Sequence, residues 1–323
     1  MDLSKEDLER LYYFLGLTRN LDDRLRKLFR QGRFEGTYFS AIGQEATTVV
    51  PTSLLKKDDF IAPSHREIGA LITRGVPIRE ITAQVYARKT SPDGGKMHPC
   101  LFGHPAYHIL IPAPLMSMQI PVAVGVALGY KIRRLDNIAV SFFGDGATSK
   151  GDFHEALNFA GVHKLPIVFI CQNNLYAESV HMRLQTAVEN LSEKARAYGF
   201  SGVSIDGNDV GLVHQTCKEA FEQARHGGGP TLVECKTYRW YGHSDIDLAS
   251  YRPQEEVEEW IRRDPLPRFE RHLFDLGILT DEKKSEILQR IEDEIEDAVD
   301  YAESSPLPDP EDVLKDVYAT TFE

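Results

Sequence analysis

The feature that most constrains the fold is a pair of short apolar runs, residues 138–143 and 167–170, each followed at once by small and polar residues. Both runs have the length and composition of buried strands, whereas the segment between them has apolar residues at helical spacing: Phe153, Ala156, Leu157 and Ala160. The order strand, helix, strand predicts a β-α-β unit. In such a unit the two strands are parallel, and the loops that follow them emerge at the same edge of the sheet, where ligands bind.

The residues that follow the two runs suggest a metal site. Gly144, Asp145 and Gly146 follow the first, and residues 171–176, with the sequence Cys-Gln-Asn-Asn-Leu-Tyr, follow the second. A carboxylate, an amide and a nearby carbonyl would meet there as an incomplete oxygen shell for magnesium, which water and the phosphates of a bound cofactor would complete. Glycines in such loops let backbone N–H groups approach a diphosphate closely.

Composition limits the class of protein. With 323 residues, 42% of them hydrophobic and 27% charged, the chain can bury a large core and has an ordinary globular make-up. No window reaches 18 consecutive apolar residues, and residues 1–6 lack the features of a secretory signal, so we expect neither a membrane span nor export. Four cysteines without paired spacing favour reduced thiols and a cytoplasmic location, or the mitochondrial matrix for a mature eukaryotic chain.

The net charge of −12 argues against nucleic-acid binding. The same charge raises a question about cofactor binding, because an acidic protein that binds a diphosphate must supply positive charge locally. Magnesium, Arg66 and His243 are the candidates for that charge.

Strand and helix signals alternate along the rest of the chain. Further strands are expected at 58–62, 202–205 and 231–235, and helices at 5–31, from about 43, at 67–73, 77–87, 121–134, 191–197 and 210–224, with three more toward the C-terminus, the last at 281–303. This alternation predicts an α/β fold with a mostly parallel sheet flanked by helices. We expect a single domain over residues 1–323, of which 253–323 form a helical C-terminal extension. The long loops 89–118 and 237–251 are expected to carry function.

Several surface features carry weaker expectations. Gly125 and Gly129, four residues apart in the helix expected at 121–134, predict a face that a sheet or another helix can approach closely. The acidic run 292–297 is expected to be a solvated helix face. His154 and His163, which flank the helix of the β-α-β unit, are expected to be structural.

The two strand-end clusters resemble the thiamine-diphosphate signature, in which Gly-Asp-Gly and a later Asn-Asn bracket the metal and the diphosphate. The loop at 237–252, which contains Thr-Tyr-Arg-Trp-Tyr-Gly-His-Ser and ends with Ser-Tyr-Arg, is similar to a loop of the 2-oxo acid dehydrogenases. It resembles the alpha subunit of their thiamine-dependent decarboxylating component. Counterparts to that family cover nearly the whole chain, at 43–46, 64–66, 119–125 and 151–155. Details at 114–115, 151–166 and 242–252 are more like the branched-chain type than the pyruvate type.

The resemblance implies a thiamine-diphosphate-binding fold with N- and C-terminal helical extensions, and it implies roles for single residues. Asp145, Asn174 and the main-chain carbonyl of Tyr176 would hold magnesium. His243 would lie close to both the cofactor and the reacting carbon, as the catalytic residue. The other residues implied to contact thiamine diphosphate are His65, Arg66, Leu115, Gly144, Gly146 and Ala147, with Arg66 pairing with a diphosphate oxygen and Gly146 and Ala147 donating through backbone N–H groups.

Two positions depart from the family pattern. Many relatives have tyrosine where this chain has His65, although an imidazole can also donate to a phosphate. A serine that is frequent in the family is replaced by Ala113, which weakens the expectation of a monovalent-ion site there.

The resemblance also implies partners and a substrate class. In the family, the glutamate that activates the cofactor belongs to a separate beta subunit, so we expect an α2β2 heterotetramer with the cofactor at the α–β interface. The reaction would be oxidative decarboxylation of a 2-oxo acid, followed by transfer of the acyl group to the lipoyl group of a transacylase. Apolar residues in and near the loop 103–115 suit a branched aliphatic substrate, namely Phe102, Ile109, Leu110, Ile111, Leu115 and Met116.

Alternatives remain open at this point. Pyruvate and acetoin are alternative substrates, because distinguishing a methyl from an isopropyl group involves only about 1–3 kcal/mol. A magnesium-dependent phosphate-ester enzyme would use Asp145 as its nucleophile. A non-catalytic assembly subunit would retain the fold of the family without its chemistry.

Overall fold

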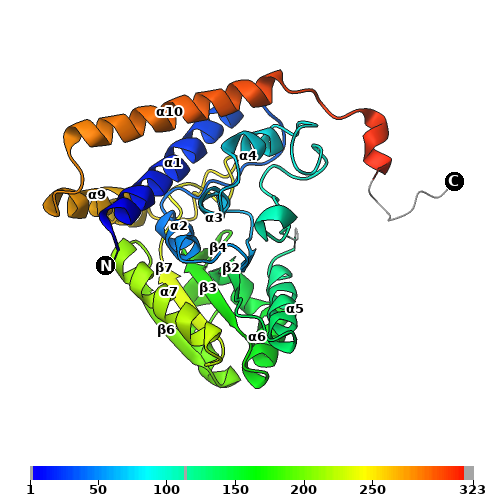
Figure 1. Cartoon of the computed structure of the whole chain (residues 1–323), viewed down its shortest axis with the longest axis vertical. Helices are drawn as coiled ribbons and strands as arrows, with labels where there is room; N and C mark the ends of the chain where they lie inside the picture. The colour runs from blue at the N-terminus through cyan, green and yellow to red at the C-terminus, as the bar shows by residue number, and fades with distance from the viewer. Residues whose placement is uncertain (1–2, 113–114, 316–323) are drawn as a thin grey trace.

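The structure is a computed structural model that describes residues 3–112 and 115–315; Ala113 and Pro114, noted above, lie outside the described residues. Its centre is a sheet of five strands in the order β1-β2-β3-β7-β6 (Figure 1). In that order their bounds are Phe60–Ala62, Ala139–Gly144, Ile167–Asn173, Thr231–Lys236 and Ser201–Asp206. Every pairing within the sheet is parallel, so the predicted α/β fold with a parallel sheet is confirmed.

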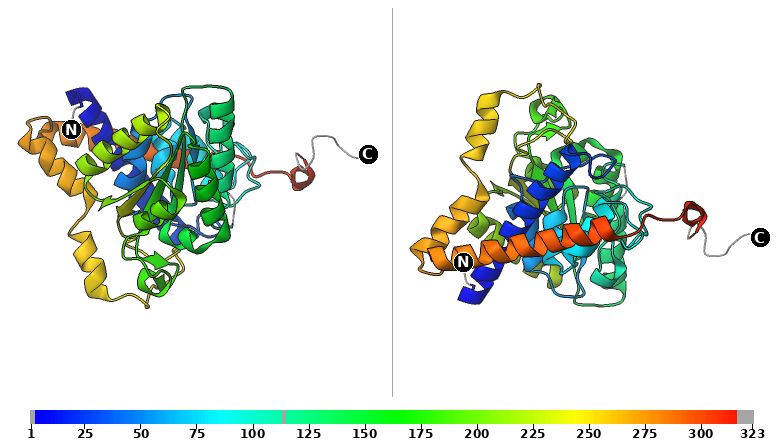
Figure 2. Two further views of the ribbon diagram at one scale, coloured as in Figure 1. Left: turned by 90° about the horizontal axis from the view of Figure 1, so that it is seen from below. Right: turned by 90° about the horizontal axis from the view of Figure 1, so that it is seen from above.

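Helices cover both faces of the sheet, because strands send alternate side chains to opposite sides. One face packs against α1 (Lys5–Arg30), α2 (Ala46–Ser53) and α7 (Val210–Arg225), through residues that include Val140, Phe142, Val168 and Ile170. The other face packs against α5 (Gln119–Ile132) and α6 (Gly151–Val162), through residues that include Ala139, Phe143, Ile167 and Phe169. Figures 1 and 2 show α7 on one side of the sheet and α5 with α6 on the other.

Further helices surround α1. α9 (Pro265–Asp275) and α10 (Asp281–Ser304) contact α1, and α4 (Ile78–Val85) contacts α10. α3 (Ile68–Thr73) contacts both α1 and α2, whereas α8 (Gln254–Ile261) packs beside the loop after β7, where Trp260 stacks on Tyr238. The long helix α10 lies across α1 and α4 (Figures 1 and 2). Glu292, Asp293, Glu296 and Asp297 are exposed, as expected for a solvated face, and two of them also pair with arginines of α1 and α4: Arg24 with Glu296 and Arg79 with Asp297.

Some elements differ from the prediction. The segment Leu191–Tyr198 is a 3₁₀ helix, and others form at Pro105–Tyr107, Asp145–Ser149, Met182–Leu184 and Pro310–Leu314. A small hairpin of β4 (Tyr176–Ala177) and β5 (Val180–His181) was not predicted, because two-residue strands leave no alternating pattern. β3 continues through Asn173, so the first half of the polar cluster belongs to the strand. None of the described helices has the length and apolarity that crossing a membrane requires.

The close approach predicted at Gly125 and Gly129 does not occur within the described chain. A Cβ atom added at either glycine would have no heavy atom within 4 Å. The inner side of α5 packs on the sheet through Ile120, Ala123 and Ala127, which leaves the two glycines on its outer side.

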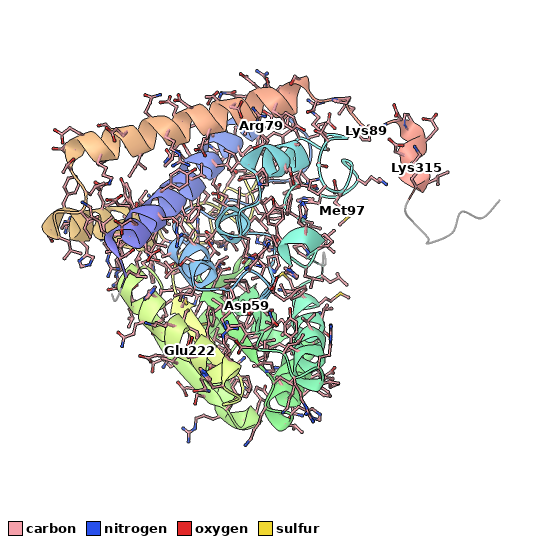
Figure 3. All side chains as sticks on the ribbon, viewed as in Figure 1. Asp59, Arg79, Lys89, Met97, Glu222 and Lys315 are labelled. Carbon is pink, nitrogen blue, oxygen red and sulfur yellow. The ribbon has the colours of Figure 1, made fainter. Side chains whose placement is uncertain are left out.

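The buried ion pair of Asp59 and Arg225 fixes the amino edge of the sheet, far from the loops that follow the strands (Asp59 is labelled in Figure 3). Asp59 is 0% exposed and lies 2.7 Å from Arg225, and it also accepts backbone N–H groups of Lys56 and Ile138 at 2.8 and 2.9 Å. We therefore expect Asp59→Asn to lower the free energy of unfolding by about 3–5 kcal/mol, because it leaves a buried cation without its counter-charge. Chemical denaturation measures this loss.

The matched control is Asp136→Asn, at the exposed end of the same edge. The Asp136 side chain is 69% exposed and pairs with Lys56, which is 56% exposed. We expect it to contribute less than about 1 kcal/mol. Equal losses for the two variants would show that the buried pair has no special weight.

Candidate active site

A cavity of about 460 Å³ opens at the carboxyl edge of the sheet, next to the ends of β2 and β3. All the predicted site residues except Ala147 line it, namely His65, Arg66, Leu115, Gly144, Asp145, Gly146, Asn174, Tyr176 and His243. Ala147 is buried, and its side chain belongs to the core on the α5–α6 face of the sheet. Residues from five separate segments of the sequence thus meet at one edge.

Parallel pairing of β2 with β3 brings Asp145 and Asn174 together. Gly144 lies opposite Gln172 in the ladder, so each strand ends close to the other and delivers its polar residue to the same point. Asp145 is 1% exposed and accepts a hydrogen bond from Gln185 at 2.8 Å. Burial raises the pKa of the Asp145 carboxyl to about 6. The carboxylate therefore sits where its negative charge is costly unless a cation lies beside it.

Three oxygens converge at this point. Asn174 Oδ1 lies 3.0 Å from the carbonyl oxygen of Tyr176 and 3.3 Å from Asp145 Oδ1. With the Asn174 amide turned over, its nitrogen would donate to the Tyr176 carbonyl and to Asp145 Oδ1 at the same two distances, so this side chain can serve the cluster as donor or as acceptor. The present orientation is supported by two hydrogen bonds, from the Tyr176 N–H to Oδ1 and from Nδ2 to Gln44 Oε1. Octahedral magnesium with ligand distances of about 2.1 Å separates neighbouring ligand oxygens by about 3 Å, so the spacing fits that ion.

The backbone between Asn174 and Tyr176 is strained. Leu175 has a φ of 71°, in the left-handed region that costs a residue other than glycine roughly 1–2 kcal/mol. The conformation is held by hydrogen bonds of the Leu175 N–H to Asn173 Oδ1 at 3.1 Å and of the Met182 N–H to the Leu175 carbonyl at 2.7 Å. This turn brings the Tyr176 carbonyl beside Asn174. Strain of this kind is typical of functional sites.

The donor set is poor in charge. Within the described residues, no group of three or more His, Cys, Asp and Glu side chains could hold a metal ion. The cluster offers one carboxylate, one amide and one carbonyl. A divalent cation there would need further anionic ligands from a bound molecule, as magnesium in phosphate-binding sites usually has.

The two glycines beside Asp145 lack a side chain for different structural reasons. A Cβ added to Gly144 would meet nothing closer than 3.9 Å, so the missing side chain leaves open space in the cavity. A Cβ added to Gly146 would lie 2.8 Å from the Cβ of Ala177 in β4. Gly146 is thus required by the packing of the hairpin, whereas Gly144 keeps room for a ligand.

Arg66 and His243 contact one another across the cavity. Arg66 is 6% exposed, donates to the carbonyls of Ser40, at 2.8 Å, and of His243, and lies 3.2 Å from His243 Nδ1. Since a guanidinium can only donate, Nδ1 accepts, and the proton of the neutral ring is assigned to Nε2. Burial and the neighbouring Arg239 lower the pKa of Arg66 to about 9, so it remains a cation at neutral pH.

His243 is held on an otherwise irregular loop. Its N–H donates to Asp247 Oδ2 at 2.7 Å, and the same carboxylate accepts from Tyr251 and from the Ala249 N–H. Burial, together with Arg66 and Arg239, lowers the pKa of His243 to about 4. The ring is therefore neutral at physiological pH and presents an Nε2–H donor, so the expectation that His243 supplies positive charge for a diphosphate is wrong.

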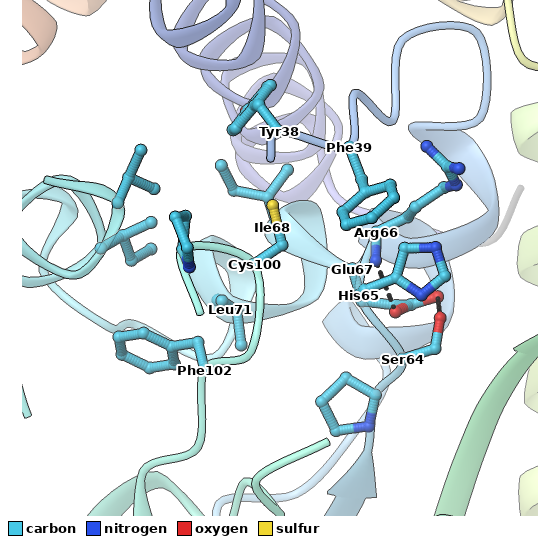
Figure 4. A pocket seen from close by; sticks show the side chains of 14 residues that line it. Tyr38, Phe39, Ser64, His65, Arg66, Glu67, Ile68, Leu71, Cys100 and Phe102 are labelled. Carbon is cyan, nitrogen blue, oxygen red and sulfur yellow. Dashed lines mark hydrogen bonds between the residues drawn. The ribbon is translucent and has the colours of Figure 1, made fainter. Parts of the chain in front are cut away.

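His65 lies between the main cavity and a small apolar side cavity of about 30 Å³ (Figure 4). Its ring packs edge-on against Phe39 at 4.7 Å, and its Nε2 has no hydrogen-bond partner among the described residues. Burial and Arg66 hold the pKa of His65 well below its usual value. Figure 4 also shows Glu67 bound to Ser64 and to the backbone N–H of Arg66, contacts that fix the segment 64–67.

The apolar residues expected to surround a substrate are only partly at the cavity. Leu115 and Met116 line it, together with Leu101 and Phe39. Phe102 lines the side cavity, and Ile109 is in the core, because bridges of Ile109 to Ile61 and to His104 hold that part of the loop against β1. Leu110 and Ile111 do not line the main cavity. Of these six residues, Leu115 and Met116 are thus the two that this chain brings to the main cavity.

Sequence reasoning missed several residues of the cavity. The chief one is Arg239, which lies three residues after β7, is 2% exposed and donates to the Glu178 carbonyl at 2.8 Å. Its Nε and Nη1 have no hydrogen-bond partner among the described residues. The only signal in the sequence was an arginine among the aromatic residues of 238–241, and that stretch was interpreted only as part of the loop motif. Other missed residues that line the cavity include Phe39 and Lys150. Gln44 and Gln185, also missed, lie behind the lining and hydrogen-bond to Asn174 and Asp145.

The neutral state of His243 can be tested by titration. We expect the ring of His243 to titrate near pH 4 in the cofactor-free protein, as seen by NMR of ¹³C-labelled histidine, with assignment from His243→Asn. Because the folded pKa lies below the unfolded value of 6.5, the unfolded chain takes up the proton first, so stability is lost as the pH falls from 6.5 to 4. A midpoint at or above 6.5 would contradict the assignment.

The sequence is similar to proteins of known function. The dehydrogenase E1 component family matches residues 14–311. The 2-oxoisovalerate dehydrogenase subunit alpha of Bacillus subtilis (strain 168) is 38% identical over 322 residues, which cover 99% of this chain and 97% of the relative. From the same strain, the alpha subunit of an acetoin:2,6-dichlorophenolindophenol oxidoreductase is 35% identical, over 99% of this chain and 96% of its own length. The pyruvate dehydrogenase E1 component subunit alpha of that strain is 36% identical, over 98% and 83%. The chain therefore belongs to the dehydrogenase E1 component family.

Proposed function

We propose that this chain is the alpha subunit of a 2-oxo acid dehydrogenase that binds thiamine diphosphate and magnesium and acts with a beta subunit. Its substrate would be a branched-chain 2-oxo acid, and the acyl group would pass to a lipoyl group on a transacylase. The observation that carries the proposal is the convergence of Asp145, Asn174 and the Tyr176 carbonyl at oxygen–oxygen distances of 3.0–3.3 Å beside a cavity of cofactor size.

The proposed cofactor-binding roles follow from charge and position. Asp145, Asn174 and the Tyr176 carbonyl would hold magnesium, and the diphosphate would complete its shell. Arg66 is a buried cation at the same cavity, and so is Arg239, whose Nε and Nη1 have no hydrogen-bond partner in the part of the chain that the structure describes. A diphosphate would add a counter-charge for both, beside the carboxylates that already lie near them: Glu67 near Arg66, and Asp145 and Asp247 near Arg239. His65, Leu115, Gly144 and the backbone N–H groups of Gly146 and Ala147 are the other proposed contacts.

His243 is the proposed catalytic residue. Thiamine diphosphate, when bound, supplies the carbanion chemistry of decarboxylation. A neutral imidazole with a proton on Nε2 can donate to the carbonyl or carboxylate of a 2-oxo acid, and Arg66 on Nδ1 keeps that tautomer in place. Phe39, Leu101, Leu115 and Met116 would exclude water and contact the aliphatic part of the substrate.

The substrate is the least determined part of the proposal. Identity to the 2-oxoisovalerate relative, 38%, exceeds that to the pyruvate and acetoin relatives, 36% and 35%, by a small margin. The apolar lining supports an aliphatic substrate. Among the described residues that line the cavity, none favours a phosphate-ester enzyme with Asp145 as nucleophile.

The direct test is turnover by the assembled enzyme. The chain, co-expressed with a cognate beta subunit, would be supplied with thiamine diphosphate, magnesium, an artificial electron acceptor and a panel of 2-oxo acids and acetoin. We expect activity that requires both chains and the cofactor, with a branched-chain 2-oxo acid as the best substrate. Preference for pyruvate or acetoin would correct the substrate, and a folded assembly without any activity would favour the assembly-subunit alternative.

The role of His243 predicts a separation of turnover from binding. We expect His243→Ala to reduce kcat by about 10²–10⁴-fold, the range for a positioned proton donor, with much less effect on thiamine diphosphate affinity. Steady-state kinetics and calorimetric titration measure the two quantities. An unchanged kcat would remove His243 from the chemistry.

Substitutions of Gly144 and Gly146 should separate an effect on cofactor binding from an effect on stability. Gly144→Ala should leave the thermal midpoint unchanged, since its Cβ meets no protein atom closer than 3.9 Å, but should weaken cofactor binding by filling the cavity. Gly146→Ala should instead lower the thermal midpoint, because its Cβ lies 2.8 Å from Ala177. If Gly144→Ala bound the cofactor normally, the diphosphate would not occupy this part of the cavity.

A further inference from the structure

The inner face of α1 carries charged side chains that the proposed chemistry does not use. Arg19, Asp22 and Arg26 lie at i, i+3 and i+7 and therefore share one side of the helix. Asp22 is 1% and Arg26 is 8% exposed. Because charged side chains are rarely buried unless they are paired, their partners indicate what this face does.

Arg26 holds the loop that carries His243. Its Nε lies 2.7 Å from Asp245 Oδ1, and its guanidinium carbon lies 3.4 Å from the centre of the Tyr241 ring. Tyr241 and Asp245 stand two residues before and two residues after His243. The Asp245 side chain is 1% exposed, whereas its second partner, Arg30, is 57% exposed and 3.5 Å away. Arg26 thus supports the loop on both sides of His243, in addition to Asp247, which accepts the His243 N–H, and Arg252, which donates to the Tyr241 carbonyl.

The other two charged residues of this face of α1, Arg19 and Asp22, hold neighbouring parts of the site. The guanidinium of Arg19 lies 4.5 Å from the Trp240 ring and pairs with Asp264 at 2.9 Å. Asp22 accepts the Ala41 N–H at 2.7 Å, next to Ser40, whose carbonyl binds Arg66.

The two segments that α1 anchors, residues 38–42 and 240–245, are also hydrogen-bonded to each other. The Asp245 N–H donates to the Tyr38 carbonyl at 2.9 Å, and the Trp240 N–H donates to the Ile42 carbonyl at 3.2 Å. Both loops that frame the Arg66–His243 contact are therefore fixed to one helix.

We propose that Arg26 is a positioning residue: by clamping Tyr241 and Asp245, it sets the place of the His243 imidazole at the active-site cavity. This inference rests on the proposed function, since it gives His243 the chemistry. The segment from Thr237 to Tyr251 contains no helix or strand, so these side-chain contacts take the place of a backbone ladder. A guanidinium can pair and stack at the same time because it is planar, which a lysine ammonium cannot do.

The test replaces Arg26 in the assembled enzyme. We expect Arg26→Met to lower kcat by about 10–100-fold, the cost of a displacement of about 1 Å in a reacting group, with thiamine diphosphate and magnesium affinity within about 2-fold of wild type. Arg26→Lys should recover only part of the loss. The matched control is Arg24→Met on the same helix, which removes a partly exposed pair with Glu296 and should leave kcat unchanged.

A double-mutant cycle distinguishes positioning from a general loss of structure. If Arg26 acts through His243, Arg26→Met should cause no further fall in kcat in a His243→Ala background. An equal fall in both backgrounds would overturn the proposal. If Arg26→Met fails to fold because Asp245 is left unpaired, Arg26→Met combined with Asp245→Asn removes both charges; a normal kcat in that folded variant would also overturn it.

A spectroscopic measurement separates this inference from the proposed function. The NMR signal of the His243 ring in the cofactor-free chain should shift in Arg26→Met and stay in place in Arg24→Met. A wild-type assembly that turns over no 2-oxo acid would refute the proposed function, while the NMR comparison would still test the clamp. An active enzyme in which Arg26→Met changes neither kcat nor the His243 signal would refute the clamp alone.

Discussion

The parallel pairing of β2 with β3 is the constraint on which the site depends. With Gly144 opposite Gln172, Asp145 and Asn174 must leave the sheet side by side, and the strained Leu175 turns the Tyr176 carbonyl in beside them. The packing that fixes this pair lies on both faces of the sheet, where α1, α2 and α7 cover one side and α5 and α6 the other. The positions of Asp145 and Asn174 are therefore set by the same apolar contacts that stabilise the fold, whereas the Tyr176 carbonyl depends on the hydrogen bonds that hold the Leu175 turn.

The cavity contains buried positive charge although the chain as a whole is negative. The protein carries a net charge of −12, yet two buried arginines, Arg66 and Arg239, line the cavity, and their field helps to keep His243 neutral. Buried cations without counter-charges are costly, so a diphosphate with magnesium would stabilise this arrangement as well as bind to it. The Asp145 carboxyl is a buried anion: burial raises its pKa to about 6, and a cation beside it would lower that pKa again. Metal and diphosphate thus each relieve a cost that the other does not.

Sequence patterns predicted the parts of the molecule that local chemistry determines. The apolar runs at β2 and β3, the helix between them and the residues that follow each strand could be read directly, because strand and helix periods and the position of Gly-Asp-Gly are local properties. Arg239 and Phe39 could not be found this way, because their place at the cavity depends on how distant loops pack. The apolar loop residues show the same limit: Ile109 has the composition of a substrate contact, but its bridges to Ile61 and His104 hold it in the core. Gly146 was correctly placed beside the cavity, and only the structure shows that Ala177 requires it.

The central claim is that one metal ion binds between the ends of β2 and β3, and its most direct test is to locate that ion. Manganese can replace magnesium in oxygen sites and scatters X-rays anomalously, so crystals of the assembled enzyme grown with thiamine diphosphate and manganese would show its position. The account predicts an anomalous peak roughly 2.0–2.3 Å from Asp145 Oδ, Asn174 Oδ1 and the Tyr176 carbonyl oxygen. A peak elsewhere, or cofactor bound with no metal among these three oxygens, would contradict it.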